Sequence, residues 1–179
     1  HSLRRRQRQM CIRDRLFTLV AVFSIGLTNV NAETTAEVKN CSELTDKMGD
    51  NVTDVVKLNS DITLHEDYDT KISLVMSKTL DFNGHTLTIP QHYGLNLIYR
   101  NTLDLKFINS DSSKRAKLNL LTNTGYTPIN NEIKMAEYTV NFEMDGIDVE
   151  FIKDFNVFLQ TSGKYKFNNV VPVSYTHLT

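Results

Sequence analysis

A short stretch of this sequence returns after 23 residues: Thr79-Leu80-Asp81-Phe82 is echoed by Thr102-Leu103-Asp104-Leu105. Asp145-Gly146 and Asn168-Asn169 are separated by the same interval. A strand that returns at a nearly fixed interval of this size is typical of a chain that coils on itself, with one turn for each repeat. The interval therefore predicts a repeating architecture, although it does not by itself indicate a substrate.

Apolar and polar residues alternate in many short segments after residue 49, as they do around Leu80, Leu103 and Phe142. This period of two predicts many short strands with one buried face. The step from Thr102 to Thr139 is longer than the repeated interval, and the turn-rich segment 121–128 can absorb the excess. The sequence thus predicts an all-β fold with unequal turns.

One short helix is expected before the strands. Ser42 can cap a helix over residues 42–48, and Gly49 can close it in a left-handed conformation. Leu44 and Met48 would lie on one face. This segment therefore predicts a helix that covers the first strands.

The order of these elements, a short helix followed by Val55-Val56-Lys57-Leu58, Asp61-Ile62-Thr63-Leu64 and 78–87, resembles the first coils of a right-handed parallel β-helix. This is the pectin-lyase-like architecture of polysaccharide lyases, hydrolases, phage tailspikes and bacterial surface adhesins. The resemblance covers roughly residues 38–170 and implies a solenoid with an N-terminal capping helix. It also implies that residues 33–170 form a truncated domain, because terminal coils need caps and none follows residue 170.

An antiparallel β-sandwich is the competing fold. Asn83-Gly84 lies between two alternating segments, and this dipeptide is a strong local signal for a hairpin. In such a hairpin Leu80 would pair with Leu87, which also keeps one face apolar. The repeated interval favours the solenoid over this alternative.

The two ends differ in composition from the middle. Residues 1–15 contain six arginines, and 171–179 form a strand-like run with no evident partner. Both resemble translated adapter sequence, so we exclude them from fold reasoning as non-native. Residues 16–32 read as a secretory signal peptide, because the apolar run 16–27 precedes small or apolar residues and a cleavage site after Ala32. That run is too short to form a stable membrane span, which needs about 20 residues.

The charge changes when residues 1–32 are set aside. They hold six of the 20 basic residues but only one of the 21 acidic ones, so the remaining chain is acidic. An acidic chain argues against nucleic acid as a partner, because phosphate contacts need clustered lysine and arginine. Cys41 is the single cysteine outside residues 1–32, which excludes an intramolecular disulfide in the remaining chain.

The echoed segments contain the candidate site residues. If they lie one above the other, Asp81 and Asp104 stack on the outer face about 4.8 Å apart. Such a pair needs a compensating charge, from Lys78 or Lys106 or from a bound calcium ion. Three interpretations of Asp81 and Asp104 are open: a solvated acidic stripe, a calcium site, or an acid/base pair for glycoside cleavage. We identify no catalytic residue and no other cofactor site.

These features predict a bacterial secreted or cell-surface protein that acts as an adhesin-like display rod. Its outer face and the loop around Gly125-Tyr126 would contact a glycan or host-surface ligand. The alternative is the N-terminal part of a carbohydrate-active enzyme, a lyase or glycoside hydrolase, with its catalytic coils beyond residue 170. The sequence does not indicate which ligand is bound or which oligomeric state the protein has.

Overall fold

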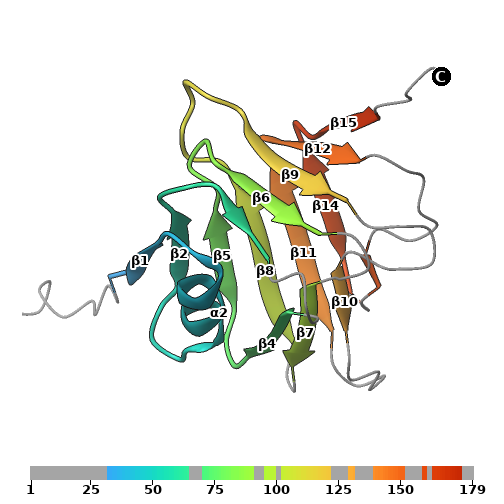
Figure 1. Ribbon diagram of the computed structural model, residues 1–179. Helices are drawn as coiled ribbons and strands as arrows, with labels where there is room; N and C mark the ends of the chain where they lie inside the picture. Colours follow the sequence, from blue (N-terminus) through green and yellow to red (C-terminus); the bar gives the residue numbers. More distant parts are fainter. Residues whose placement is uncertain are drawn as a thin grey trace, which may run out of the picture. The chain divides into compact units, whose positions relative to one another are not determined.

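The protein is described here by a computed structural model that places residues 32–64, 70–90, 95–99, 102–121, 129–131, 139–151, 159–160 and 163–174. The chain divides into two units, residues 1–32 and 33–179. All the elements described below belong to the second unit (Figure 1).

The described strands form three sheets, and the single described helix is α2 (Cys41–Gly49). The first sheet contains, in order, β1 (Thr35–Val38), β2 (Val55–Leu58), β5 (Lys78–Asp81), β8 (Leu103–Ile108), β11 (Val140–Asp145) and β14 (Tyr165–Asn168). The second contains β3 (Ile62–Thr63), β6 (Thr86–Ile89), β9 (Ala116–Leu120), β12 (Ile147–Phe151) and β15 (Val171–Ser174). The third contains β4 (Thr70–Leu74), β7 (Leu95–Tyr99), β10 (Ile129–Asn131) and β13 (Leu159–Gln160).

Every pairing between the described strands is parallel. From β2 onward, consecutive strands enter different sheets, and each strand pairs with the third strand after it. The prediction of an all-β fold is confirmed, and the arrangement is compatible with a β-helix-like fold.

The alternative prediction, an antiparallel hairpin at Asn83-Gly84, is wrong. These two residues join β5 to β6, which belong to different sheets. Both have positive φ angles, 47° and 75°, and the His85 amide donates a hydrogen bond of 2.8 Å to the carbonyl of Phe82. The dipeptide forms a tight turn as its sequence predicts, but the turn is a corner between two sheets.

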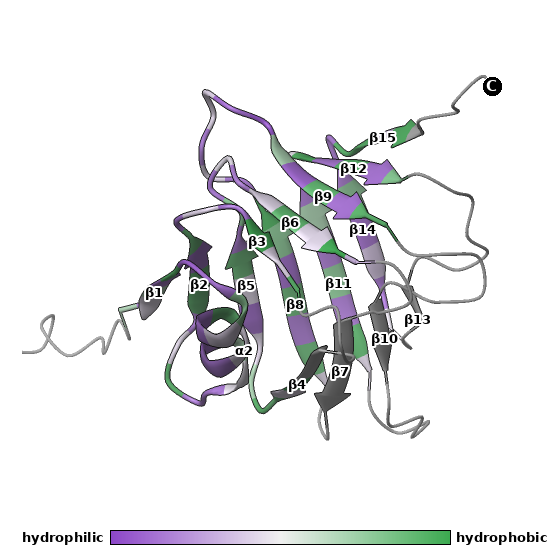
Figure 2. Cartoon of the chain, viewed as in Figure 1, coloured by the Kyte–Doolittle hydropathy of each residue, from purple (hydrophilic) through white to green (hydrophobic). Residues whose placement is uncertain are grey.

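The core lies between the sheets and consists of the inward residues of each strand. Figure 2 shows the alternation of apolar and polar residues along β8 and β11. The buried side chains of the first and second sheets join those of α2 and β4 in one apolar cluster. Three phenylalanines of this cluster, Phe82, Phe107 and Phe142, form a row with ring centroids 5.6 and 5.1 Å apart. The half-exposed Phe167 extends the row, with its centroid 6.1 Å from that of Phe142.

The register confirms most of the intervals read from the sequence. Val56 aligns with Leu80, Leu103 with Val140, and Met144 with Phe167. The step from β5 to β8 is different, because Thr79 aligns with Lys106 and not with Thr102. The echo that first suggested a repeat is thus out of register by four residues.

The helix begins one residue earlier than expected and has a different cap. Asn40 is the N-cap, and its side-chain oxygen accepts a hydrogen bond from the Glu43 amide at 2.9 Å. Leu44 and Met48 are buried as predicted, whereas Gly49 belongs to the helix and does not close it in a left-handed conformation. The residue after the helix is Asp50, in an extended conformation.

Asp50 belongs to a partly buried polar cluster beside the helix, which we call the Asp50 cluster: Asp50, Thr53 and Lys78. The Lys78 side chain is fully buried, and its ammonium donates to an Asp50 oxygen at 3.0 Å and to the Thr53 carbonyl. Thr53 donates to the other Asp50 oxygen at 2.7 Å. This cluster fastens the exit of α2 to the start of β5.

The tail expected to lack a partner has one. β15 pairs in parallel with β12, with Val171 opposite Asp148. The non-native origin of residues 171–179 and of residues 1–15 stays a prediction, and the domain boundaries at residues 32 and 170 do as well.

On the neighbouring strand β14, Tyr165 and Phe167 are 44% and 50% exposed although their register partners on β11 are buried.

Candidate functional site

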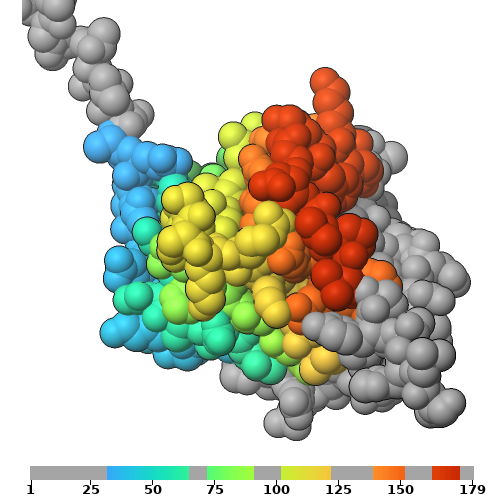
Figure 3. All heavy atoms as spheres, turned by 90° about the horizontal axis from the view of Figure 1, so that it is seen from above, coloured from blue at the N-terminus to red at the C-terminus, as the bar shows by residue number. Residues whose placement is uncertain are grey.

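A groove of about 540 Å³ lies where three corners between the first and second sheets meet. The first corner is the segment 109–115 between β8 and β9, which is longer than the four-residue corner 82–85 between β5 and β6. The second is Gly146, between β11 and β12, and the third is Asn169, between β14 and β15. Figure 3 shows the β8–β9 region in yellow beside the C-terminal segment in red on one face of the molecule.

The long corner is held by its own polar side chains. The side-chain nitrogen of Asn109 donates to the carbonyls of Asp111 and Lys114, at 3.0 and 2.8 Å. The carboxylate of Asp111 accepts hydrogen bonds from the Ser113 hydroxyl and amide, which lower its pKa. Small polar residues that bond to nearby backbone groups are the usual way to stabilise such a loop.

An arginine joins the first and third corners of the groove. The Arg115 guanidinium donates to an Asp148 oxygen at 2.6 Å and to the backbone carbonyl of Asn169 at 2.9 Å. The hydrogen bond to Asp148 raises the pKa of Arg115, which is charged at all physiological pH values. The wall formed by Arg115 is therefore fixed before any ligand arrives.

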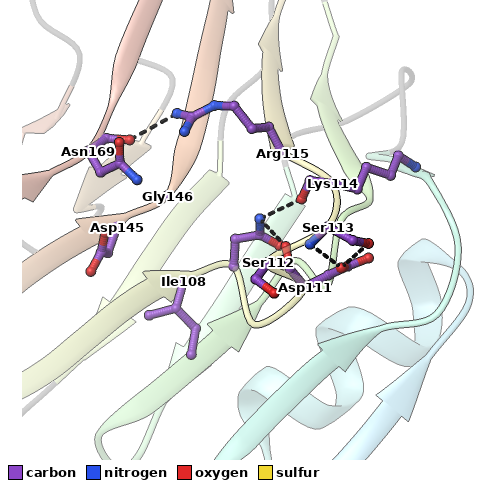
Figure 4. A pocket seen from close by; sticks show the side chains of 10 residues that line it. Ile108, Asp111, Ser112, Ser113, Lys114, Arg115, Asp145, Gly146 and Asn169 are labelled. Atoms are coloured by element: carbon purple, nitrogen blue, oxygen red, sulfur yellow. Dashed lines mark hydrogen bonds between the residues drawn. The ribbon is translucent and has the colours of Figure 1, made fainter.

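Other polar side chains of the groove have no such partner. Ser112, Asp145 and Asn169 make no side-chain hydrogen bond or ion pair to any described residue, although the charge of Asp145 also acts on Lys166 of β14. The same holds for the ammonium of Lys114 on the far rim, whose charge acts on the carboxylates of Asp61 and Asp111 (Figure 4). Ile108 contributes an apolar surface. The groove thus combines a bonded frame with a carboxylate, an amide and a hydroxyl that have no hydrogen-bond partner among the described residues.

The predicted pair of carboxylates is not brought together. Asp81 aligns with Ile108, four residues along β8 from Asp104, which places the two residues about 13 Å apart along the strand direction. A calcium ion binds oxygens at about 2.3–2.6 Å, so one ion cannot contact both carboxylates. The expected stacking is therefore wrong, because the register differs from the echo by four residues.

Each of these two aspartates has a structural partner of its own. Asp81 is 4% exposed rather than outward in solvent, and one of its oxygens accepts hydrogen bonds from the amides of Asn83 and Ser110, both at 2.9 Å. Asp104 is exposed, accepts a hydrogen bond from Asn141 at 2.8 Å, and lines a smaller hollow of about 190 Å³ with Asp54. Within the described ranges, no three His, Cys, Asp or Glu side chains are grouped to hold a metal ion.

Two further predicted features are placed only in part. Ala32 is exposed, and cleavage after it stays a prediction. The loop around Gly125-Tyr126 lies outside the described residues.

In the part of the chain that the structure places, no helix has both the length and the apolar character needed to cross a bilayer.

Asp111, Asp145 and Asn169 were not predicted as a group. A signal was present in the sequence, because Asn109-Ser110-Asp111-Ser112-Ser113 is an uninterrupted polar run between two apolar segments. Such a run predicts an extended corner, but only the register reveals which corners lie beside it.

Comparison with known proteins gives no assignment for this site. No protein-family model, no curated protein and no solved structure matches the chain. The function must therefore be argued from the geometry of the groove and from the topology of the sheets.

Proposed function

We propose that this chain is a secreted or cell-surface protein of bacterial origin that folds as a right-handed parallel β-helix and displays the groove to a hydroxyl-rich glycan. The observation on which the proposal depends is the topology, in which each strand from β2 onward pairs in parallel with the third strand after it. A chain that coils in this way stacks its corners, so that side chains distant in sequence form one continuous outer surface.

The chemistry of the groove favours a glycan. A free carboxylate accepts hydrogen bonds from neighbouring hydroxyl groups, and a free side-chain amide both donates and accepts. Asp145 and Asn169 supply these two groups, and Ile108 offers an apolar surface to the face of a sugar ring. Because Arg115 and Asn109 already make hydrogen bonds within the protein, little ordering is needed when a ligand binds.

A glycan array tests the binding proposal. The wild-type protein is expected to bind neutral glycans, and Asp145→Ala and Asn169→Ala are each expected to weaken the binding about tenfold, the loss of one or two hydrogen bonds. Lys106→Ala serves as the control, since Lys106 lies on β8 outside the groove. Equal binding by all four proteins, or no binding to any glycan, would contradict the proposal.

Export can be tested separately. Residues 16–40, placed behind an initiator methionine and two lysines and joined to a reporter enzyme, are expected to carry it out of the bacterial cytoplasm, with cleavage after Ala32 visible by N-terminal sequencing. Ala32→Phe removes the small residue at the cleavage site and is expected to leave the uncleaved form. A reporter that stays in the cytoplasm would contradict secretion but would not affect the glycan proposal.

The alternative of a carbohydrate-active enzyme stays a prediction. The described residues offer no observation that favours it over display.

A further inference from the structure

The corner between β5 and β6 contains the single Asn-Gly dipeptide of this sequence. Asparagine followed by glycine is the dipeptide most prone to deamidation, because glycine has no side chain to hinder attack by its backbone nitrogen. In that reaction the Gly84 nitrogen attacks Cγ of Asn83, the Gly84 proton passes to solvent, and the side-chain nitrogen leaves as ammonia. Water then opens the cyclic imide to aspartate or isoaspartate.

Both nitrogens that take part in this reaction already donate hydrogen bonds in the folded protein. The Gly84 amide, which would be the nucleophile, donates to the Asn109 side-chain oxygen at 2.8 Å. The Asn83 side-chain nitrogen, which would be the leaving group, donates to the Leu58 carbonyl at 3.2 Å. The Asn83 backbone amide donates to Asp81 at 2.9 Å. The dipeptide is thus fixed by residues from β2, β5 and the β8–β9 corner.

Space around the turn adds to this restraint. A Cβ atom on Gly84 would lie 2.9 Å from an Asp111 oxygen and 3.3 Å from Lys114 carbons. The segment 109–115 therefore lies directly over the corner. Gly84 also has a φ of 75°, which other residues rarely adopt, so the corner needs glycine in spite of the chemical hazard that glycine brings.

We propose that Asn83 is a latent deamidation site and that the side-chain oxygen of Asn109 protects it by holding the Gly84 amide. Deamidation in the folded protein is slow, and it becomes fast when the long corner over Gly84 is displaced. Isoaspartate formation would lengthen the main chain at the turn and add a negative charge beside Asp81, which would disrupt the corner.

Peptide mapping by mass spectrometry tests this proposal. The folded protein and the protein in denaturant are incubated at mildly alkaline pH, and the deamidated fraction of the peptide that contains Asn83 is followed over time. We expect the folded protein to react at least about tenfold more slowly than the unfolded chain. Equal rates would overturn the proposal.

Two variants separate the role of the Asn109 oxygen from the integrity of the loop. Asn109→Ala removes the acceptor and is expected to raise the folded-state rate about tenfold. Ser113→Ala removes the hydroxyl that bonds to Asp111 in the same loop but leaves the Asn109 acceptor of the Gly84 amide in place, so its rate is expected to stay low. A folded Asn109→Ala protein with the wild-type rate, or a Ser113→Ala protein as fast as Asn109→Ala, would overturn the assignment to Asn109.

Hydrogen exchange provides a measurement that needs no variant, in case Asn109→Ala does not fold. The Gly84 amide of the wild-type protein is expected to exchange much more slowly than the exposed amide of Ser112. Exchange of the Gly84 amide at the unprotected rate would contradict the hydrogen bond on which the proposal rests.

Discussion

The Asp50 cluster and the groove are both networks of charged and polar side chains, but they differ in burial. In the Asp50 cluster the Lys78 side chain is fully buried, whereas in the groove the Arg115 side chain is 41% exposed. A buried charge depends on its partners, because solvent cannot replace them. An exposed pair is screened by water and contributes little to stability. The comparison indicates that the Asp50 cluster serves the fold and that the groove is free to serve binding.

The largest effect is expected from Asp50→Ala. This change leaves the Lys78 ammonium buried with the Thr53 carbonyl as its one remaining partner among the described residues. It is expected to lower the free energy of unfolding by about 3–5 kcal/mol. Urea denaturation measures the loss. Asp46→Ala, which removes an exposed acid from the same helix, is the control and is expected to change stability by less than about 0.5 kcal/mol. A small effect of Asp50→Ala would show that burial does not distinguish the two networks.

The pH dependence of stability gives the next effect. Partial burial alone would raise the pKa of Asp50, but hydrogen bonds from Thr53, Lys78 and Val52 outweigh it and lower the pKa well below its usual value. A carboxyl whose pKa is depressed by folding stabilises the protein above its unfolded pKa, near 3.9, and this contribution is lost as the pH falls toward the folded value.

The free energy of unfolding of the wild-type protein is therefore expected to fall as the pH drops below about 4. Asp50→Asn removes the titrating group and is expected to flatten this part of the curve. Urea denaturation at a series of pH values compares the two proteins. If the free energy of unfolding of both proteins falls equally with pH, other carboxyls cause the acid sensitivity.

Breaking the ion pair in the groove is expected to matter less. Arg115→Ala removes the bonds to Asp148 and to the Asn169 carbonyl near the surface, and it is expected to lower the free energy of unfolding by about 0.2–1 kcal/mol. Lys166→Ala, which breaks the exposed pair between Lys166 and Glu143 on β14 and β11, offers a matched control. A loss from Arg115→Ala as large as that from Asp50→Ala would contradict the distinction between the two regions.

The smallest effect on stability is expected at the groove residues without partners. Asp145→Asn breaks no hydrogen bond or ion pair to a described residue, so the free energy of unfolding is expected to change by less than about 0.5 kcal/mol. Thermal denaturation of the two proteins measures the difference. Substantial destabilisation by this change would indicate that Asp145 has a structural role.

The strands were predictable because their period of two is set by burial alone. Leu80 and Phe142 alternate with polar neighbours, and each is buried in the core. The register of β5 against β8 was not predictable in the same way. A shift of four residues keeps every apolar side chain on the inner face, so the hydrophobic pattern cannot distinguish an alignment of Thr79 with Thr102 from the observed alignment with Lys106.

The site was harder to predict than the fold. The groove depends on which corners are adjacent, and this follows from the register. The predicted register placed Asp104 beside Asp81, whereas the observed register differs by four residues and Asp104 contacts Asn141. The helix shows the same limit locally. Both Asn40 and Ser42 are good N-caps. Asn40 takes this position together with Glu43, whose amide donates to the Asn40 side chain and whose carboxylate accepts from the Lys39 amide.

The unequal steps between successive strands have a practical consequence. The segment 109–115 is longer than the β5–β6 corner, and yet β8 stays in register with β5 and β9 with β6. Chain length at a corner is thus decoupled from the packing beneath it. Foreign peptides inserted at this corner would be presented on a core that does not need redesign, as long as the Asn109 contact with the Gly84 amide is kept.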